Sequence, residues 1–176
     1  PYAKPPVGEL RWKPPAEPEP WDGVFAADRF PNKCMQLGRH NGFFQKEFGE
    51  NTAYEVPSSE DCRYLNIWAP AAESAEKLPV AVYIHGGAFM GGHCSEVEFE
   101  GAGYCRRGVI LVSINYRCNI FGFLAHPWLS AESEKGISGN YGILDQVAAL
   151  RWVCENIGAF GGDADKLLRC DDLRST

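Results

Sequence analysis

Leu78-Pro79-Val80-Ala81-Val82-Tyr83-Ile84-His85-Gly86-Gly87-Ala88-Phe89 is the stretch of this sequence that decides the fold. Its first part, residues 78–84, is a nearly continuous apolar run, which is typical of a strand covered on both faces of a sheet. The glycine pair that follows permits a tight turn and a close approach of the backbone to a ligand. We therefore predict a buried strand over 78–84 with a functional turn at its carboxyl end.

The segments around this stretch predict an α/β layered fold with a mixed, mostly parallel sheet. Two more strands are expected at 64–69 and 109–115, and a short helix at 96–106. Apolar residues at helical spacing predict a longer helix over about 141–157, which Asn140 would cap and Gly158 would end. These apolar residues are Leu144, Val147, Leu150, Cys154 and Ile157.

Composition excludes several classes of function. The chain has 176 residues, 45% of them hydrophobic, which suits one globular domain, and its net charge of -6 gives no basic surface for nucleic acid. No apolar stretch approaches the roughly 20 residues of a membrane-spanning helix, so a soluble protein is expected. No signal segment is present, and the sequence opens at Pro1 as if within a longer chain, so a cytoplasmic and a secreted location both stay open.

The amino-terminal third of the chain is irregular. Prolines crowd residues 1–22 and predict an extended surface segment, which Leu10, Trp12, Trp21 and Val24 would anchor to the core. Residues 34–61 predict a long loop with a cysteine at each end. The seven cysteines include no Cys-x-x-Cys pair, so we expect no metal site and no cofactor.

Eight motifs in the same order resemble those of the type-B carboxylesterases, relatives of the cholinesterases in the α/β-hydrolase superfamily. They are Pro5-Pro6-Val7-Gly8-Glu9-Leu10-Arg11-Trp12, Ser59-Glu60-Asp61-Cys62-Arg63-Tyr64-Leu65-Asn66-Ile67-Trp68, His85–Phe89, Asn115-Tyr116-Arg117, Phe121-Gly122-Phe123, Ser138-Gly139-Asn140-Tyr141-Gly142, Asp145-Gln146 and Phe160-Gly161-Gly162-Asp163. The resemblance covers residues 1–166. It implies the amino-terminal part of an α/β-hydrolase domain, without its first strands and followed by a divergent tail at 167–176.

The resemblance also implies an activity and its residues. The family hydrolyses small carboxylic esters through an acyl-serine intermediate, and backbone N–H groups stabilise the oxyanion that forms. By position, Gly87 and Ala88 supply two of these N–H groups, and Gly86 supports the turn. No serine has the glycines of a G-x-S-x-G nucleophile motif; Ser138 comes nearest, with its second glycine one residue too early. This chain alone is therefore expected to be inactive.

Further residues carry structural roles by the same resemblance. It implies a disulfide between Cys34 and Cys62, with free thiols as the alternative in a reducing compartment. It also implies two ion pairs, Arg11 with Glu60 and Arg117 with Asp145. No tryptophan lies between the two cysteines, which favours broad, neutral esters over choline esters.

Two alternatives to an esterase remain open. The charged tail Leu167-Leu168-Arg169-Cys170-Asp171-Asp172-Leu173-Arg174-Ser175-Thr176 replaces the buried strand that leads to the family's serine, and Ser175 lacks the flanking glycines of a nucleophile. The chain could thus be an inactive truncated product, or it could belong to a non-catalytic binding or adhesion module on the same fold. The absence of an Asn-x-Ser/Thr site favours a microbial source.

Overall fold

A computed structural model of the chain describes residues 1–37, 56–71, 76–97 and 100–167. The strands are β1 (Lys33–Cys34), β2 (Ser58–Ser59), β3 (Leu65–Trp68), β4 (Leu78–Ile84), β5 (Ile110–Ile114) and β6 (Gly162–Leu167). The α-helices are α2 (Ala102–Cys105), α3 (Asn119–Phe123), α4 (Pro127–Ala131) and α5 (Tyr141–Asn156), and the 3-10 helices are η1 (Gly8–Leu10) and η4 (Ile157–Phe160).

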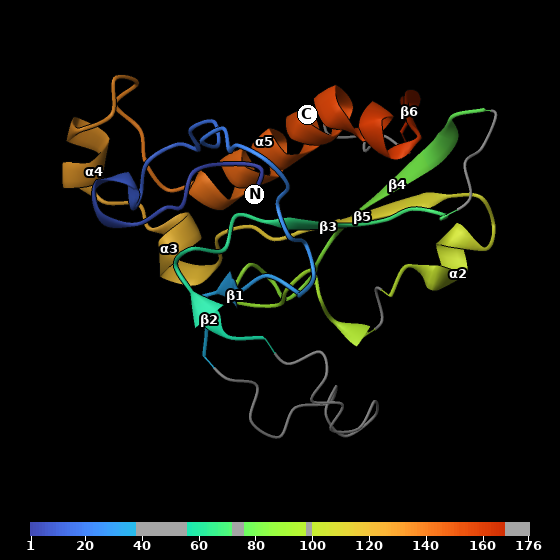
Figure 1. Cartoon of the computed structure of the whole chain (residues 1–176). Coiled ribbons are helices and arrows are strands. Elements are labelled where there is room, and N and C mark those ends of the chain that lie inside the picture. Colours follow the sequence, from blue (N-terminus) through green and yellow to red (C-terminus); the bar gives the residue numbers. More distant parts are fainter. Residues whose placement is uncertain (38–55, 72–75, 98–99, 168–176) are drawn as a thin grey trace.

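The central sheet has the strand order β3-β5-β4-β6 (Figure 1). β4 is parallel to both of its neighbours, β5 and β6, whereas β3 is antiparallel to β5. The mixed, mostly parallel sheet predicted from the sequence is confirmed. The strand predicted at 78–84 is β4 with the same bounds, and β3 and β5 lie within the other two predicted strands.

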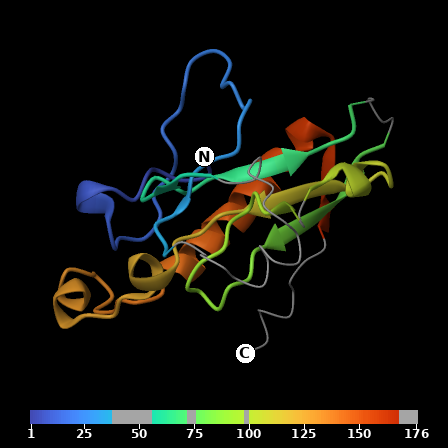
Figure 2. The same ribbon diagram turned by 90° about the horizontal axis from the view of Figure 1, so that it is seen from below.

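Helix α5 covers one face of this sheet (Figures 1 and 2). The main core lies between them, where buried Val80, Val112 and Ile114 of the strands pack with Ala149 and Val153 of the helix. Every residue of β5 is buried, as expected for a central strand with both faces covered. No helix within the described ranges is long and apolar enough to cross a membrane.

The buried stripe of α5 differs from the predicted one. The helix buries residues at four-residue spacing, namely Tyr141, Asp145, Ala149 and Val153, and Ile157 continues the stripe into η4. Leu144 and Val147, which we expected in the core, are 40% and 48% exposed. Ile157 is buried as predicted, but the prediction for Leu144 and Val147 was wrong because apolar spacing alone does not show that Asp145 occupies a core position.

Three smaller predictions also need correction. Asn140 precedes α5, but its side chain makes no capping hydrogen bond. The helix expected at 96–106 is only the short α2. Of the expected amino-terminal anchors, Trp21 and Val24 are 50% and 97% exposed.

The amino-terminal segment is instead anchored at its beginning and in its middle. Tyr2 and Ala3 belong to the main core, and the Tyr2 hydroxyl donates a 2.7 Å hydrogen bond to the Asn115 carbonyl. Trp12 Nε1 donates a 2.8 Å hydrogen bond to the Ile120 carbonyl. The extended segment therefore lies against both the sheet and α3.

The chain forms a further strand, β6, whose last residue, Leu167, is the first residue of the predicted tail. β6 pairs parallel with β4, with Leu78 opposite Gly162 and Val80 opposite Leu167 and an irregularity between these pairs. The loop residues 38–55 and the tail residues 168–176 lie outside the described part of the chain.

Candidate functional site

The turn after β4 is strongly constrained. Gly87, Ala88 and Phe89 have φ angles of 111°, 52° and 61°, and the Met90 amide closes the turn with a 2.9 Å hydrogen bond to the Gly87 carbonyl. Positive φ costs roughly 1–3 kcal/mol for a residue with a side chain, so surrounding contacts must hold Ala88 and Phe89 in place. Such strain is common where a backbone must present its groups to a ligand.

His85 and its neighbours fix the start of this turn. The His85 ring is buried and stacks on Tyr116 with 4.3 Å between ring centroids, and the Tyr116 hydroxyl donates a 2.9 Å hydrogen bond to the His85 carbonyl. A side chain at Gly92 would lie 2.5 Å from the Gly86 carbonyl oxygen. Glycine at position 92 therefore allows the turn to fold back on its own first residues.

The turn borders a pocket of about 760 Å³. Gly87 lies in its wall, and among the described contacts no protein acceptor takes up the amides of Gly87 and Ala88. The other lining residues are mostly apolar: Met35, Gln36, Leu37, Met90, Gly91, Asn119, Ile120 and Phe121. The pocket thus combines mostly apolar described walls with the backbone of Gly87 at one side.

Two side chains that the sequence interpretation did not single out contact this turn. Gln36 accepts a hydrogen bond from the Gly92 amide at 2.8 Å and donates to the Gly92 carbonyl at 3.0 Å. Asn119 Nδ2 donates to the Met90 carbonyl at 3.5 Å, and the Asn119 backbone amide donates a 2.6 Å hydrogen bond to the Phe89 carbonyl. Both residues come from segments remote in sequence, and no motif marked either of them.

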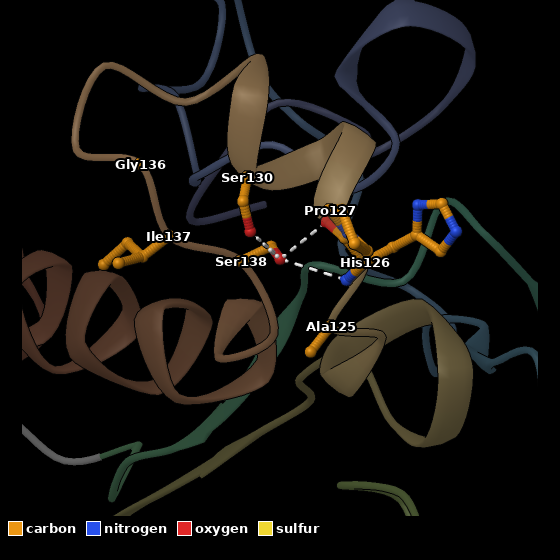
Figure 3. Close-up of a pocket in the computed structure, with 7 residues that line it drawn as sticks. All are labelled: Ala125, His126, Pro127, Ser130, Gly136, Ile137 and Ser138. Carbon is orange, nitrogen blue, oxygen red and sulfur yellow. Dashed lines mark hydrogen bonds between the residues drawn. The ribbon is translucent and has the colours of Figure 1, made fainter.

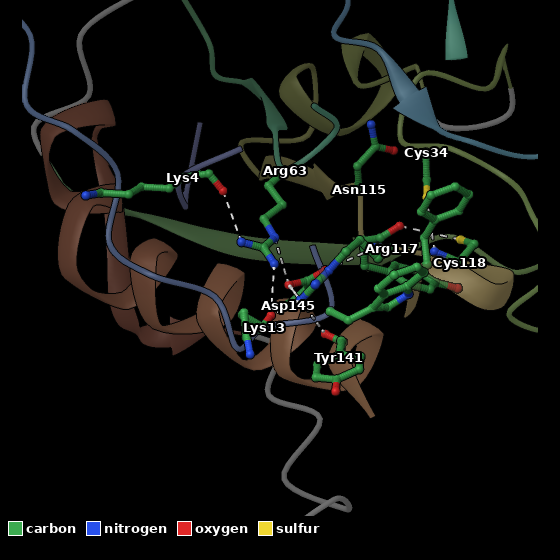
Figure 4. Close-up of polar contacts among 12 residues, drawn as sticks. Lys4, Lys13, Cys34, Arg63, Asn115, Arg117, Cys118, Tyr141 and Asp145 are labelled. Atoms are coloured by element: carbon green, nitrogen blue, oxygen red, sulfur yellow. Dashed lines mark hydrogen bonds and ion pairs between the residues drawn. The ribbon is translucent and has the colours of Figure 1, made fainter. Parts of the chain in front are cut away.

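Arg117 and Asp145 form a buried ion pair (Figure 4). Arg117 Nε and Asp145 Oδ2 are 2.7 Å apart, and both side chains are at most 2% exposed. Arg63 is a third member that the sequence interpretation missed: its Nε lies 3.0 Å from Asp145 Oδ1. Burial lowers the pKa of Arg63, and the nearby Asp145 carboxylate opposes that shift.

The same two arginines hold the amino-terminal segment. Arg63 donates a 3.0 Å hydrogen bond to the Lys4 carbonyl, and Arg117 donates a 2.9 Å hydrogen bond to the Lys13 carbonyl (Figure 4). The ion-pair network therefore connects β5, α5 and the extended segment.

The second expected ion pair lies nearer the surface. Arg11 contacts both carboxylate oxygens of Glu60, and Arg11 Nη2 lies 2.7 Å from Glu60 Oε1. The side chains are 38% and 23% exposed. This pair attaches η1 to the segment before β3.

The expected disulfide is not formed. Cys34 and Cys62 are free thiols, packed with Cys118 in a second, smaller buried cluster. The Cys118 amide donates a 3.2 Å hydrogen bond to Cys34 Sγ. Hydrogen bonds from the Cys118 and Cys62 thiols lower the pKa of Cys34 well below its ordinary value, because each of them favours a charged sulfur. The sulfur of Cys34 is thus engaged as a hydrogen-bond acceptor.

Ser138, the serine nearest to a nucleophile motif, has a structural environment (Figure 3). Its hydroxyl donates to the His126 carbonyl at 3.2 Å and lies 2.7 Å from the Ser130 hydroxyl. The ring of His126 does not serve as its base, because Nδ1 accepts a hydrogen bond from the Trp128 amide at the start of α4. These residues line an open pocket of about 400 Å³ away from the turn at 87–89.

Comparison with known proteins identifies a family for this chain. The model described as "Carboxylesterase family" matches residues 1–168. The chain is 45% identical over 167 residues to fumonisin B1 esterase of Sphingopyxis macrogoltabida, covering 95% of this chain and 29% of that protein. It is 46% identical over 169 residues to para-nitrobenzyl esterase of Bacillus subtilis, covering 95% and 32%.

A solved structure agrees with the fold. The Geobacillus stearothermophilus carboxylesterase EST55 superposes with a TM-score of 0.78 at 48% sequence identity, covering 95% of this chain and 31% of that one. The chain thus spans about a third of the length of the relatives that it matches.

Proposed function

This chain belongs to the carboxylesterase family, and from that premise we propose that the whole protein hydrolyses carboxylic esters, with residues 85–92 forming its oxyanion hole. In this reaction a nucleophile attacks the ester carbonyl, whose oxygen gains negative charge as the carbon becomes tetrahedral. The amides of Gly87 and Ala88 would donate hydrogen bonds to that oxygen. The nucleophile and its base would come from beyond the third of the relatives' length that this chain spans.

The strained turn carries this proposal. Residues 87–89 have three successive positive φ angles and are exposed, and Gly87 lines the apolar pocket, which supports a role for this turn in holding an oxyanion. A rigid turn suits an oxyanion hole because donors that are already oriented need no rearrangement in the transition state. Removal of one such donor typically lowers kcat about 100- to 1,000-fold.

The apolar walls of the pocket support neutral esters as the substrate class. Met35, Leu37 and Met90 offer hydrophobic surface, and no residue of the described part of the chain that lines the pocket carries a charge. A cationic alcohol group would find no carboxylate among these residues. We therefore propose esters with uncharged acyl and alcohol groups.

A chimera tests the proposed function. Residues 1–166 would replace the matching part of the Bacillus subtilis para-nitrobenzyl esterase, and hydrolysis of p-nitrophenyl acetate would be measured. We expect turnover in the chimera and in its Ala88→Gly variant, which keeps the amide, and a loss of at least 100-fold in kcat in Ala88→Pro, which lacks it.

Two results would contradict the proposal. One is a folded chimera, shown by circular dichroism, without esterase activity. The other is an Ala88→Pro variant that hydrolyses the ester as fast as Ala88→Gly. The 176-residue chain by itself should hydrolyse p-nitrophenyl acetate only at the background rate.

A further inference from the structure

We propose that Gln36 and Asn119 are positioning residues, which hold the turn at 87–89 in the conformation that presents its amides. The inference rests on the proposed function, which makes the turn an oxyanion hole. Whether the two residues hold the conformation of the turn can be tested without any ester. The two residues come from different segments of the chain: Gln36 follows β1, and Asn119 begins α3.

Gln36 fastens the end of the turn to the segment after β1. Its Oε1 accepts from the Gly92 amide at 2.8 Å, and its Nε2 donates to the carbonyls of Gly92 and Cys34, at 3.0 Å each. Gly91 makes this approach possible, because a side chain there would lie 2.6 Å from Gln36 Oε1. One amide side chain therefore joins two backbone segments through three hydrogen bonds.

Asn119 fastens the middle of the turn. Its backbone amide donates to the Phe89 carbonyl at 2.6 Å, and its Nδ2 donates to the carbonyls of Met35 at 2.6 Å and Met90 at 3.5 Å. Asn119 has a φ of 47°, a conformation that asparagine tolerates better than most residues with a side chain. The side chain thus bridges the turn to the same segment that carries Gln36.

The hydrogen bonds of Gln36 and Asn119 indicate that these side chains position the turn and do not bind a ligand. Both amides line the 760 Å³ pocket, where a polar side chain would ordinarily be read as a ligand contact. Each already has its Nδ2 or Nε2 engaged with backbone carbonyls, and Asn119 Oδ1 accepts from the Phe121 amide at 3.4 Å. Their polar groups are therefore directed at the protein backbone, and both side chains act on the turn that carries the amides of Gly87 and Ala88.

The test uses amide hydrogen exchange, measured by NMR on the 176-residue chain. Asn119→Gly retains the positive φ and the backbone amide but loses the Nδ2 bonds, and Gln36→Met keeps the length of the side chain without its polar atoms. We expect the Met90 and Gly92 amides to exchange at least 10-fold faster in each variant, with Val112 of β5 unchanged. Gln146→Met on α5 serves as the matched glutamine control and should change none of these rates.

Conservative variants separate a positioning role from a general stabilising one. Gln36→Glu keeps the acceptor for the Gly92 amide, so Gly92 should exchange more slowly than in Gln36→Met. The coupling between the amide and α protons of Ala88 reports its φ directly, and should change in Gln36→Met and in Asn119→Gly.

Two outcomes would overturn the proposal: unchanged exchange at Met90 and Gly92, or an equal acceleration at Val112, which would mean that the side chains only stabilise the fold. If either first variant does not fold, Gln36→Glu and Asn119→Asp, which keep the side-chain volume but lose the Nε2 and Nδ2 donors, decide through the exchange of the Met90 amide and the Ala88 coupling. An inactive chimera with slow exchange at the turn would refute the proposed function and leave this inference standing.

Discussion

Arg117 and Asp145 join the end of β5 to α5 through three hydrogen bonds. The Arg117 backbone amide and Nε both donate to Asp145 Oδ2, at 3.1 and 2.7 Å, and Nη2 donates to Oδ1 at 2.9 Å. The carboxylate lies within the buried stripe of the helix and also faces Arg63. Two cations thus depend on one anion that is shielded from water.

Replacing this anion should destabilise the fold severely. Asp145→Asn keeps the shape of the side chain but leaves two buried guanidinium groups without a counter-charge, which typically costs about 3–5 kcal/mol. We expect that loss in the free energy of unfolding, measured by urea denaturation at pH 7. Glu155→Gln removes an exposed carboxylate from the same helix and should change the value by less than about 0.5 kcal/mol. Equal midpoints and slopes for both variants would contradict the role assigned to Asp145.

Arg63, which precedes β3, and Arg11, which follows η1, should differ in how much they contribute to the free energy of unfolding. Arg63→Met removes a cation that is 1% exposed and leaves the Lys4 carbonyl without its donor, so we expect a loss of more than about 2 kcal/mol. Arg11→Met breaks a partly exposed pair with Glu60 and should cost at most about 1 kcal/mol. The same urea titration measures both. If Arg11→Met lowered the free energy of unfolding more than Arg63→Met, the exposure of an ion pair would not predict its contribution to stability.

A glycine in α3 should be intolerant of any side chain. The β-carbon of Gly122→Ala would lie 2.1 Å from the Arg117 carbonyl oxygen, and neither backbone can move away without disturbing the ion pair. We expect a loss of more than about 3 kcal/mol, or no soluble protein.

Gly158→Ala is the matched comparison, since its β-carbon would meet only the end of the Lys77 side chain at 3.6 Å. Thermal unfolding followed by circular dichroism should place this variant within a few degrees of the unsubstituted chain. A similar melting temperature for both alanine variants would show that the helix accommodates the clash.

The buried thiol of Cys94 should contribute to alkaline unfolding. Burial raises its pKa from an ordinary value of 9.0 to about 12, because a thiolate is poorly solvated there. Between these values the unfolded chain releases the proton and the folded chain retains it. The free energy of unfolding should therefore fall as pH rises from 9 to 12.

Urea titrations at several pH values in this range would measure the slope. Cys94→Ala removes the titrating group, so its unfolding free energy should decrease less steeply than that of the unsubstituted chain. Identical slopes for the two proteins would mean that the thiol titrates alike in the folded and unfolded states.

Local sequence patterns were sufficient for β3, β4 and β5, but they did not reveal β1, β2 or β6. β4 has the predicted bounds because a continuous apolar run followed by a glycine pair has few alternatives. The buried face of α5 could not be found in this way, because Asp145 occupies a core position that apolar periodicity assigns to solvent. Its burial depends on Arg63 and Arg117, which are distant in sequence.

In the candidate site, too, local features could be predicted from the sequence and contacts between distant segments could not. The glycine-rich turn was visible in the sequence, since its residue types reflect local backbone conformation. Gln36 and Asn119 were not, because amide side chains that bind backbone carbonyls leave no spacing or charge pattern. The sulfur environment of Cys34 was also unforeseen, since the Cys118 amide that contacts it is brought there only by folding.

The carbonyl contacts of Arg63 and Arg117 affect how the extended segment can evolve. These arginines hold the main chain at positions 4 and 13 and make no use of the lysine side chains there. Because every amino acid supplies the same carbonyl group, natural variation at these two positions can alter surface charge while the path of the segment is preserved. Substitutions that accumulate along this edge should therefore be far more numerous than substitutions at positions 63 and 117.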